Sequence, residues 1–267
     1  MESPNSCEMD GNADFYGIGI RLGLYAQSLT TLLVTLFVQE EEGLNRILNL
    51  LLQLAIFAGT LLLTQTGEIH AFEVVIVFWL LVGALSSLTG DGLSAVGTFS
   101  GTCRLLFYTA LSAYGCWFWF DGLDTMQVAP CTEIVFFGGS TLDGWFRTFG
   151  NIVAIASLAV SSGMLVWDAA VYAKGRDAKK QQNRSRRPQT EIILMILSIA
   201  MAVLSVASAE YIVRANHLVA VDDIFAVGQL LAFLVGLFQL LNALVPIFFK
   251  GRLWAPRCWL LFGRHLT

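Results

Sequence analysis

Charged and metal-binding residues are scarce in this sequence. Only 13% of its 267 residues are Asp, Glu, Lys or Arg, and it has three His and five Cys residues. It contains no H-E-x-x-H motif and no aspartate-rich diphosphate-binding motif, and no two cysteines have the spacing of metal ligands. Asp222 and Asp223 are followed by no further carboxylate one turn later. We therefore expect neither a metal ion nor any other cofactor.

Other absences bear on the class of membrane protein. A retinal Schiff base needs a lysine inside a membrane span, and all the lysines lie outside the apolar runs: Lys174, Lys179, Lys180 and Lys250. Transporters built from inverted repeats have spans interrupted by Gly and Pro, but only Pro246 of the five prolines lies within an apolar run. The sequence thus excludes a rhodopsin and disfavours an active transporter. Gly17 and Gly19 lack the strand-to-helix setting of a phosphate loop, and we expect them to allow close helix packing.

Apolar residues are abundant and make up 56% of the chain. A helix needs about 20 of them to cross a hydrocarbon core of about 30 Å. Seven runs with few or no charges are present, at residues 17–38, 47–64, 71–90, 105–120, 148–167, 192–209 and 224–249. They predict an all-α, polytopic membrane protein in which residues 17–249 form one seven-helix membrane domain.

The basic residues predict the orientation of this domain. With seven spans, thirteen of the sixteen Lys and Arg residues lie on one side, the exceptions being Arg21, Arg147 and Arg214. Lys and Arg accumulate in the short cytoplasmic loops of membrane proteins. We therefore expect a basic cytoplasmic tail at residues 250–267 and a lumenal or exterior segment at residues 1–16. The basic loop between the fifth and sixth spans is expected to contact anionic membrane lipid rather than nucleic acid.

This orientation also predicts the state of the cysteines and of one glycosylation motif. Cys7 and Cys131 both fall on the non-cytoplasmic side, where disulfides persist, and we expect them to pair. Cys103 and Cys258 fall on the reducing side, and Cys116 lies within the fourth span. Asn183 begins an N-x-S motif in the basic cytoplasmic loop. It should therefore remain unmodified.

Ionisable residues within or beside the spans gather toward the predicted lumenal side: Arg21, His70, Glu73, Asp121, Glu210, Arg214 and His217. One interpretation is a belt of interfacial ion pairs with an aromatic girdle, in which Glu210 and Arg214 form a helical pair. The other is a functional site, because ionisable groups at membrane depth are costly. Glu73 favours the second interpretation, since no basic residue lies within a turn after it. Its partner would be Arg21 or His70, or it would be protonated.

Several segments together resemble a group of fungal seven-helix membrane proteins. They are DFYGIGIRLGLYAQ (14–27), HAFEVVIVFWLLVGALSSLTG (70–90), WFWFDGLD (117–124), Cys131 with VFFGG (135–139), GWFRTFGN (144–151), AEYIVRANH (209–217) and GQLLAFLVG (228–236). Some members of this group resemble the membrane-bound terpene cyclases of meroterpenoid pathways, such as those of ascofuranone, ascochlorin and macrophorin. The resemblance implies an enzyme of secondary metabolism that cyclises an apolar prenylated aromatic compound, and we expect it in the endoplasmic reticulum.

The polar residues suit this chemistry. Protonation of a prenyl epoxide or alkene needs a neutral acid in a dry cavity and no metal. We expect Glu73 as the first acid, Glu210 as a second acid or terminating base, and Asp121 as a third candidate. Arg21 would keep one carboxylate ionised so that its neighbour stays protonated. Aromatic faces stabilise cations, and the candidates for this role are Tyr25, Trp79, Tyr108, Trp117 and Trp119.

A second hypothesis is a non-enzymatic membrane protein. Seven helices with an exterior N-terminus and a basic cytoplasmic loop also describe a receptor, a sensor or a scaffold, and architecture alone does not establish function.

Overall fold

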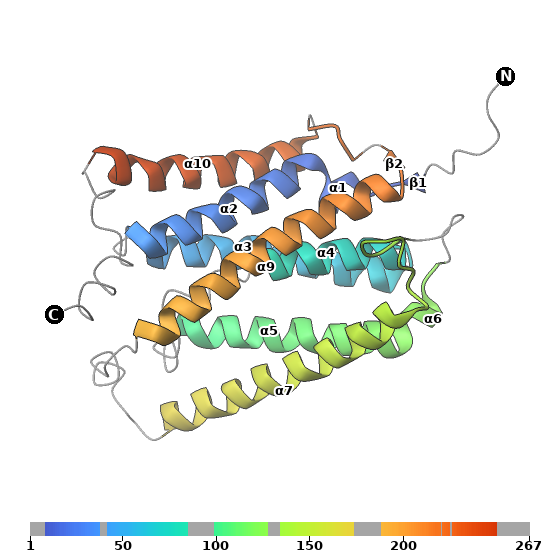
Figure 1. The fold of residues 1–267 in the computed structure, drawn as a ribbon, viewed down its shortest axis with the longest axis horizontal. Coiled ribbons are helices and arrows are strands. Elements are labelled where there is room, and N and C mark those ends of the chain that lie inside the picture. Colours follow the sequence, from blue (N-terminus) through green and yellow to red (C-terminus); the bar gives the residue numbers. More distant parts are fainter. Residues whose placement is uncertain are drawn as a thin grey trace.

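The computed structural model describes residues 9–37, 42–84, 99–127, 134–173, 188–219, 221–224 and 226–249. There the chain is a bundle of helices that extend along one long axis (Figure 1). Seven helices of 13 or more residues build it: α2 (Ile18–Phe37), α3 (Glu42–Thr66), α4 (Ala71–Gly83), α5 (Phe99–Trp117), α7 (Trp145–Ala173), α9 (Pro188–Ala215) and α10 (Val227–Phe249). The prediction of an all-α protein is confirmed.

Five of the described helices are long and apolar enough to cross a membrane, in the ranges Ala13–Phe37, Ile47–Thr66, Trp145–Ala173, Met195–Ala215 and Val227–Phe248. Ala71–Ala84 is a shorter apolar helix, and residues 85–90 of the predicted third span lie outside the described residues. The chain is thus an integral membrane protein with several spans.

The start of α5 differs from the prediction. The helix begins at Phe99 rather than at residue 105, so Arg104 lies within it and not in a loop. Its side chain is buried, with 6% exposed. An arginine ends an apolar run in a sequence, but a helix can continue through it where the surrounding protein shields the charge.

Successive helices run in opposite directions along the axis (Figure 1). One end of the bundle holds the start of α2, the turn between α3 and α4, and the strands β1 (Met9–Asp10) and β2 (Leu218–Val219). We call it the β1–β2 end. The last turns of α2, α7 and α10 lie at the opposite end, whereas the shorter α4 ends nearer the middle of the bundle, where the Ser28 hydroxyl of α2 donates to the Gly83 carbonyl (Figure 1).

The first and the last of the seven helices pack against each other more closely than the other pairs. A Cβ atom on Gly23 of α2 would lie 2.5 Å from the carbonyl oxygen of Ala232 in α10, and one on Gly236 would lie 2.4 Å from that of Gly23. A Cβ on Gly19 would lie 2.5 Å from the carbonyl oxygen of Gln229. The expected role of the early glycines in close helix packing is confirmed.

Helix α4 is the centre of the bundle. Nearly all of its side chains are buried, from Ala71 to Leu81, and it packs mainly on α9 and also on α2 and α3. A helix that is apolar on every side is expected in such a position. By contrast, α7 lies at the periphery (Figure 1), and exposes apolar side chains such as Ile152 and Val166.

Loops and short elements cover the β1–β2 end. The parallel pair β1–β2 joins the N-terminal segment to the connection between α9 and α10. Asn216 holds the connection before α7, since its side chain accepts from the Ile134 N–H at 2.8 Å and donates to the Ile134 carbonyl at 2.7 Å. The turn that follows contains Gly138 and Gly139, with φ of 75° and 72°. These strands and loop contacts were not predicted.

The end of α5 is irregular. The helix continues into one π-helical turn, η4 (Phe118–Gly122), and then into α6 (Leu123–Thr125). Arg147 of α7 donates to the carbonyl oxygens of Trp119 at 3.3 Å and Phe120 at 3.2 Å. It also binds both carboxylate oxygens of Asp124, at 3.1 and 2.8 Å. Arg147 therefore supplies donors to the carbonyl groups that a helix end leaves unpaired.

Candidate functional site

Two separate carboxylate networks occupy the β1–β2 end. Both use residues from the beginning of the described chain, on α1 (Ala13–Tyr16) or α2, and bind them to a carboxylate on a later helix. One network is centred on Glu73 of α4 and the other on Glu210 of α9. The sequence predicted both carboxylates, but it did not predict that each has its own set of partners.

Glu73 is buried, with 3% of the residue exposed, and both of its carboxylate oxygens accept hydrogen bonds. Oε1 accepts from the Tyr16 hydroxyl at 2.6 Å and from the Asn12 N–H at 3.2 Å. Oε2 accepts from the His70 N–H at 2.8 Å, and the imidazole Nδ1 of His70 lies 3.5 Å away. Glu73 thus caps the first turn of α4 and fastens the N-terminal segment to it. Of the two expected partners, the structure supplies His70 and not Arg21.

Arg21 is buried, with 2% exposed, and binds two other carboxylates. Its Nη1 lies 2.8 Å from Glu210 Oε2, and its Nη2 lies 3.0 Å from Asp222 Oδ1. The hydroxyl of Tyr25, one turn further along α2, donates to Glu210 Oε1 at 3.0 Å. Within the described residues, Glu210 pairs with Arg21 and not with Arg214. The expected helical pair is therefore replaced by a contact between helices.

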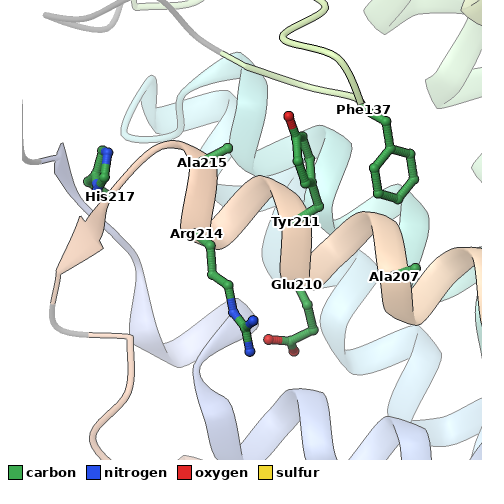
Figure 2. A pocket seen from close by; sticks show the side chains of 7 residues that line it. All are labelled: Phe137, Ala207, Glu210, Tyr211, Arg214, Ala215 and His217. Carbon is green, nitrogen blue, oxygen red and sulfur yellow. The ribbon is translucent and has the colours of Figure 1, made fainter.

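A pocket of about 460 Å³ lies against the last turns of α9. Figure 2 shows its wall, in which Glu210 and Arg214 point to one side of the helix and Tyr211 to the other, toward Phe137. Residues with small or basic side chains complete the lining: Ala207, Ala215 and His217. Of the three predicted catalytic carboxylates, Glu210 alone lines this pocket.

The predicted aromatic residues are dispersed. Tyr25 contacts Glu210, as described above. Trp79 stacks on Phe136 with ring centroids 5.8 Å apart, and Phe136 contacts Phe137 of the pocket wall at 5.0 Å. Trp79 is thus linked to the pocket through two rings.

The other three aromatic candidates pack around α5. Tyr108 is buried against Phe107, with ring centroids 5.5 Å apart. Trp119 packs between Phe118 and Phe146. Trp117 contacts Tyr114 and is 38% exposed. None of the three is in the wall of the α9 pocket.

The remaining predicted residues lie elsewhere. Asp121 is exposed on the π-helical turn. Cys7 and Cys131 lie outside the described residues, while Cys103 and Cys116 are free. In the described part of the chain, no group of three or more His, Cys, Asp or Glu residues could hold a metal ion.

Several residues of the site were not predicted, and their signals differ. Tyr16 lies five residues before Arg21 in the quoted segment 14–27. Its position beside a polar helix start could have indicated a role in the site. Asp222 was considered only as a metal ligand, although it lies beside a predicted helix start. Phe137 and Tyr211 had no local signal, because their contact at 4.8 Å joins a loop to a helix far along the chain.

No protein-family profile, curated protein or solved structure matches this chain. The resemblance to fungal terpene cyclases therefore stays a prediction based on the quoted segments.

Proposed function

We propose that this chain is a membrane-bound terpene cyclase that protonates an epoxide or alkene of a prenylated aromatic compound. The observation that carries this proposal is the position of Glu210. It lines a pocket in an apolar helix bundle, and it shares a buried arginine with a second carboxylate. The volume of about 460 Å³ lies within the range of about 300–1,000 Å³ that is usual for small-molecule sites.

The charges around Arg21 allow Glu210 to carry a proton. With both carboxylates ionised, the group formed by Arg21, Glu210 and Asp222 has one net negative charge. Protonation of Glu210 leaves Arg21 paired with Asp222, so the buried guanidinium keeps a counter-ion. The side chain of Asp222 is 77% exposed, which gives the group contact with water for proton exchange.

The reaction consumes no cofactor. Transfer of the Glu210 proton to an epoxide oxygen would break the bond between this oxygen and the more substituted carbon. The resulting cation would be attacked by a neighbouring alkene, which forms a ring. Loss of a proton from the final cation would return it to the Glu210 carboxylate. Product and substrate would then be isomers.

The pocket also offers aromatic faces to such a cation. Phe137 and Tyr211 pack with centroids 4.8 Å apart on its wall. Cation–π contacts contribute about 0.5–1 kcal/mol at exposed sites and about 2 kcal/mol when water is excluded. An apolar substrate can reach the bundle from the bilayer.

In this proposal Glu73 and Asp121 have lesser roles than their sequence context suggested. Glu73 is buried, does not line the α9 pocket, and binds the N-terminal segment to the start of α4, which suits a positioning residue of the β1–β2 end. Asp121 is exposed, so water surrounds it.

The proposal includes the orientation in an endoplasmic reticulum membrane. Basic residues of the sequence occur between α7 and α9 and after α10, and the helix ends that border these segments lie away from the β1–β2 end. By the positive-inside rule, the β1–β2 end would face the lumen.

The test uses membranes that contain the full chain and a farnesyl phenol with a terminal epoxide. We expect a cyclised isomer from the wild type, and a loss of about 100-fold or more in rate for Glu210→Gln, since general acid catalysis contributes about 10²–10⁴-fold. The conservative variant Tyr25→Phe should retain activity with a shifted pH profile. Glu68→Gln, an exposed change at the same end, serves as the control.

Equal rates for the wild type and Glu210→Gln would refute the acid assignment. Failure of the wild type to cyclise a panel of epoxide and alkene substrates would favour a receptor, sensor or scaffold instead.

A further inference from the structure

The α9 pocket has a basic side as well as an acidic residue. Arg214 and His217 come from the last turn of α9 and the residues after it, and both are exposed. Arg214 has no ion pair among the described residues, because Glu210 binds Arg21. Its guanidinium donors are therefore available to a ligand.

The backbone holds His217 in an unusual conformation at the rim of this pocket. Its φ is 48°, in the left-handed region, where residues other than glycine are uncommon. Its N–H donates to the Arg214 carbonyl at 3.2 Å, and the next residue, Leu218, begins the pairing with β1. These contacts fix the conformation, and residues held in this way gather at ligand sites.

The pocket lining has an aromatic part as well as a basic part. In Figure 2 Arg214 points to one side of α9, and Tyr211 points to the other, where Phe137 lies. Ala207 and Ala215, which have small side chains, line the same pocket. A flat ring could pack on Tyr211 and Phe137 while a polar substituent reaches Arg214.

We infer that this pocket recognises the substrate by an aromatic ring that bears a carboxylate. The planar guanidinium of arginine matches a carboxylate in a bidentate geometry. The inference rests on the proposed function and adds to it the charge of the aromatic head.

The test measures binding without turnover. The purified full chain in detergent micelles is titrated with a farnesyl hydroxybenzoic acid and with its methyl ester, using quenching of tryptophan fluorescence. Both ligands have the same ring and tail, and only the acid is charged at pH 7.5. Partitioning into micelles is the same for every protein variant, so the ratio of the two dissociation constants is compared between variants.

We expect the preference for the acid over the ester to be about tenfold or more greater in the wild type than in Arg214→Gln. Hydrogen bonds to charged groups contribute about 1.5–3 kcal/mol, and 1.4 kcal/mol is a factor of ten in a dissociation constant. Arg214→Lys should retain part of the preference. The ester should bind the wild type and Arg214→Gln equally, which shows that the variant is folded. Glu68→Gln should leave both constants unchanged.

Equal acid-to-ester ratios in the wild type and Arg214→Gln would overturn the inference. The two proposals fail in different ways. Turnover of an epoxide substrate without any preference for the acid would support the cyclase and refute recognition of a carboxylate. A preference for the acid that depends on Arg214, in a protein that turns over no substrate, would support the binding site and refute the cyclase.

Discussion

Tyr16 donates a 2.6 Å hydrogen bond to Glu73, although 57 residues separate them in the sequence. Both residues are buried, with 0% and 3% exposed. The bond ties the short helix α1 to the start of the central helix α4. It therefore links α1, which lies at the β1–β2 end, to the core of the bundle.

Removal of this hydroxyl should destabilise the protein. We expect Tyr16→Phe to lower the free energy of unfolding by about 1.5–3 kcal/mol, because hydrogen bonds to charged groups have this strength and Glu73 loses a buried donor. Unfolding in mixed micelles with a rising fraction of SDS measures the change. Tyr172→Phe is the control, since Tyr172 is 81% exposed. Similar stabilities of the two variants would show that this hydrogen bond does not stabilise the packing of α1 on α4.

The contact between α2 and α10 should not tolerate a methyl group. Gly23→Ala would place a Cβ 2.5 Å from a carbonyl oxygen of α10, and overpacking of this kind costs about 1–3 kcal/mol. The matched control is Gly163→Ala in α7, where a Cβ meets nothing within 4 Å. We expect the first variant to unfold at a lower temperature than the wild type and the second to unfold at the same temperature or higher. A stable Gly23→Ala protein would contradict the close approach.

Arg21 and Glu210 should be energetically coupled. A double-mutant cycle with Arg21→Gln and Glu210→Gln isolates their interaction, and contacting charged residues show coupling of about 0.5–3 kcal/mol. We expect a value above 1 kcal/mol, because Arg21 is buried. The same cycle with Arg214→Gln in place of Arg21→Gln should give a value near zero. A larger coupling for Arg214 would mean that the helical pair forms instead.

One ion pair at the end of α5 should depend on acid pH. The hydrogen bond from Arg147 holds the pKa of Asp124 below its ordinary value of 3.8. A lowered pKa means that the stabilisation is complete above pH 3.8 and is lost as the pH falls through the lowered pKa. Asp124→Asn should therefore unfold at a lower temperature than the wild type at pH 6, and this difference should shrink below pH 3.8. A difference that is constant down to pH 2.5 would exclude the ion pair as its cause.

The proposed orientation can be tested with glycosylation and proteolysis. Asn183 should carry no glycan in cells, although it begins an N-x-S motif. An epitope tag after residue 267 should be digested when protease is added to sealed microsomes, because their cytoplasmic side faces outward. A glycan on Asn183 would contradict the proposed orientation. So would a tag that resists protease until the microsomes are opened with detergent.

The sequence predicted the parts of this fold that depend on composition and local pattern. Apolar runs predicted the helices, and Gly19 and its neighbours predicted a close contact. Glu73 was singled out because no basic residue follows it within a turn of its helix. Boundaries were less predictable, as Arg104 shows, because a run of letters does not reveal which charges the folded protein shields.

The partners in the site were not predictable in this way. The links from Tyr16 to Glu73 and from Arg21 to Asp222 join segments far apart in the chain, and their formation depends on how seven helices pack. Helix faces were sufficient to group the polar residues at one end. They did not separate the Glu73 network from the Glu210 network, because that depends on which side chains meet across helices.

The ion pairs of Arg21 have a consequence for biosynthesis. Arg21 is synthesised 189 residues before Glu210 and 201 residues before Asp222, which corresponds to about 10 to 40 s at ribosomal rates of about 5–20 residues per second. During this interval the nascent first span has a cation without its counter-ions, and a long basic side chain in that state extends toward the lipid headgroups. A ribosome that stalls before codon 210 would leave the cell with a helix that still displays this charge.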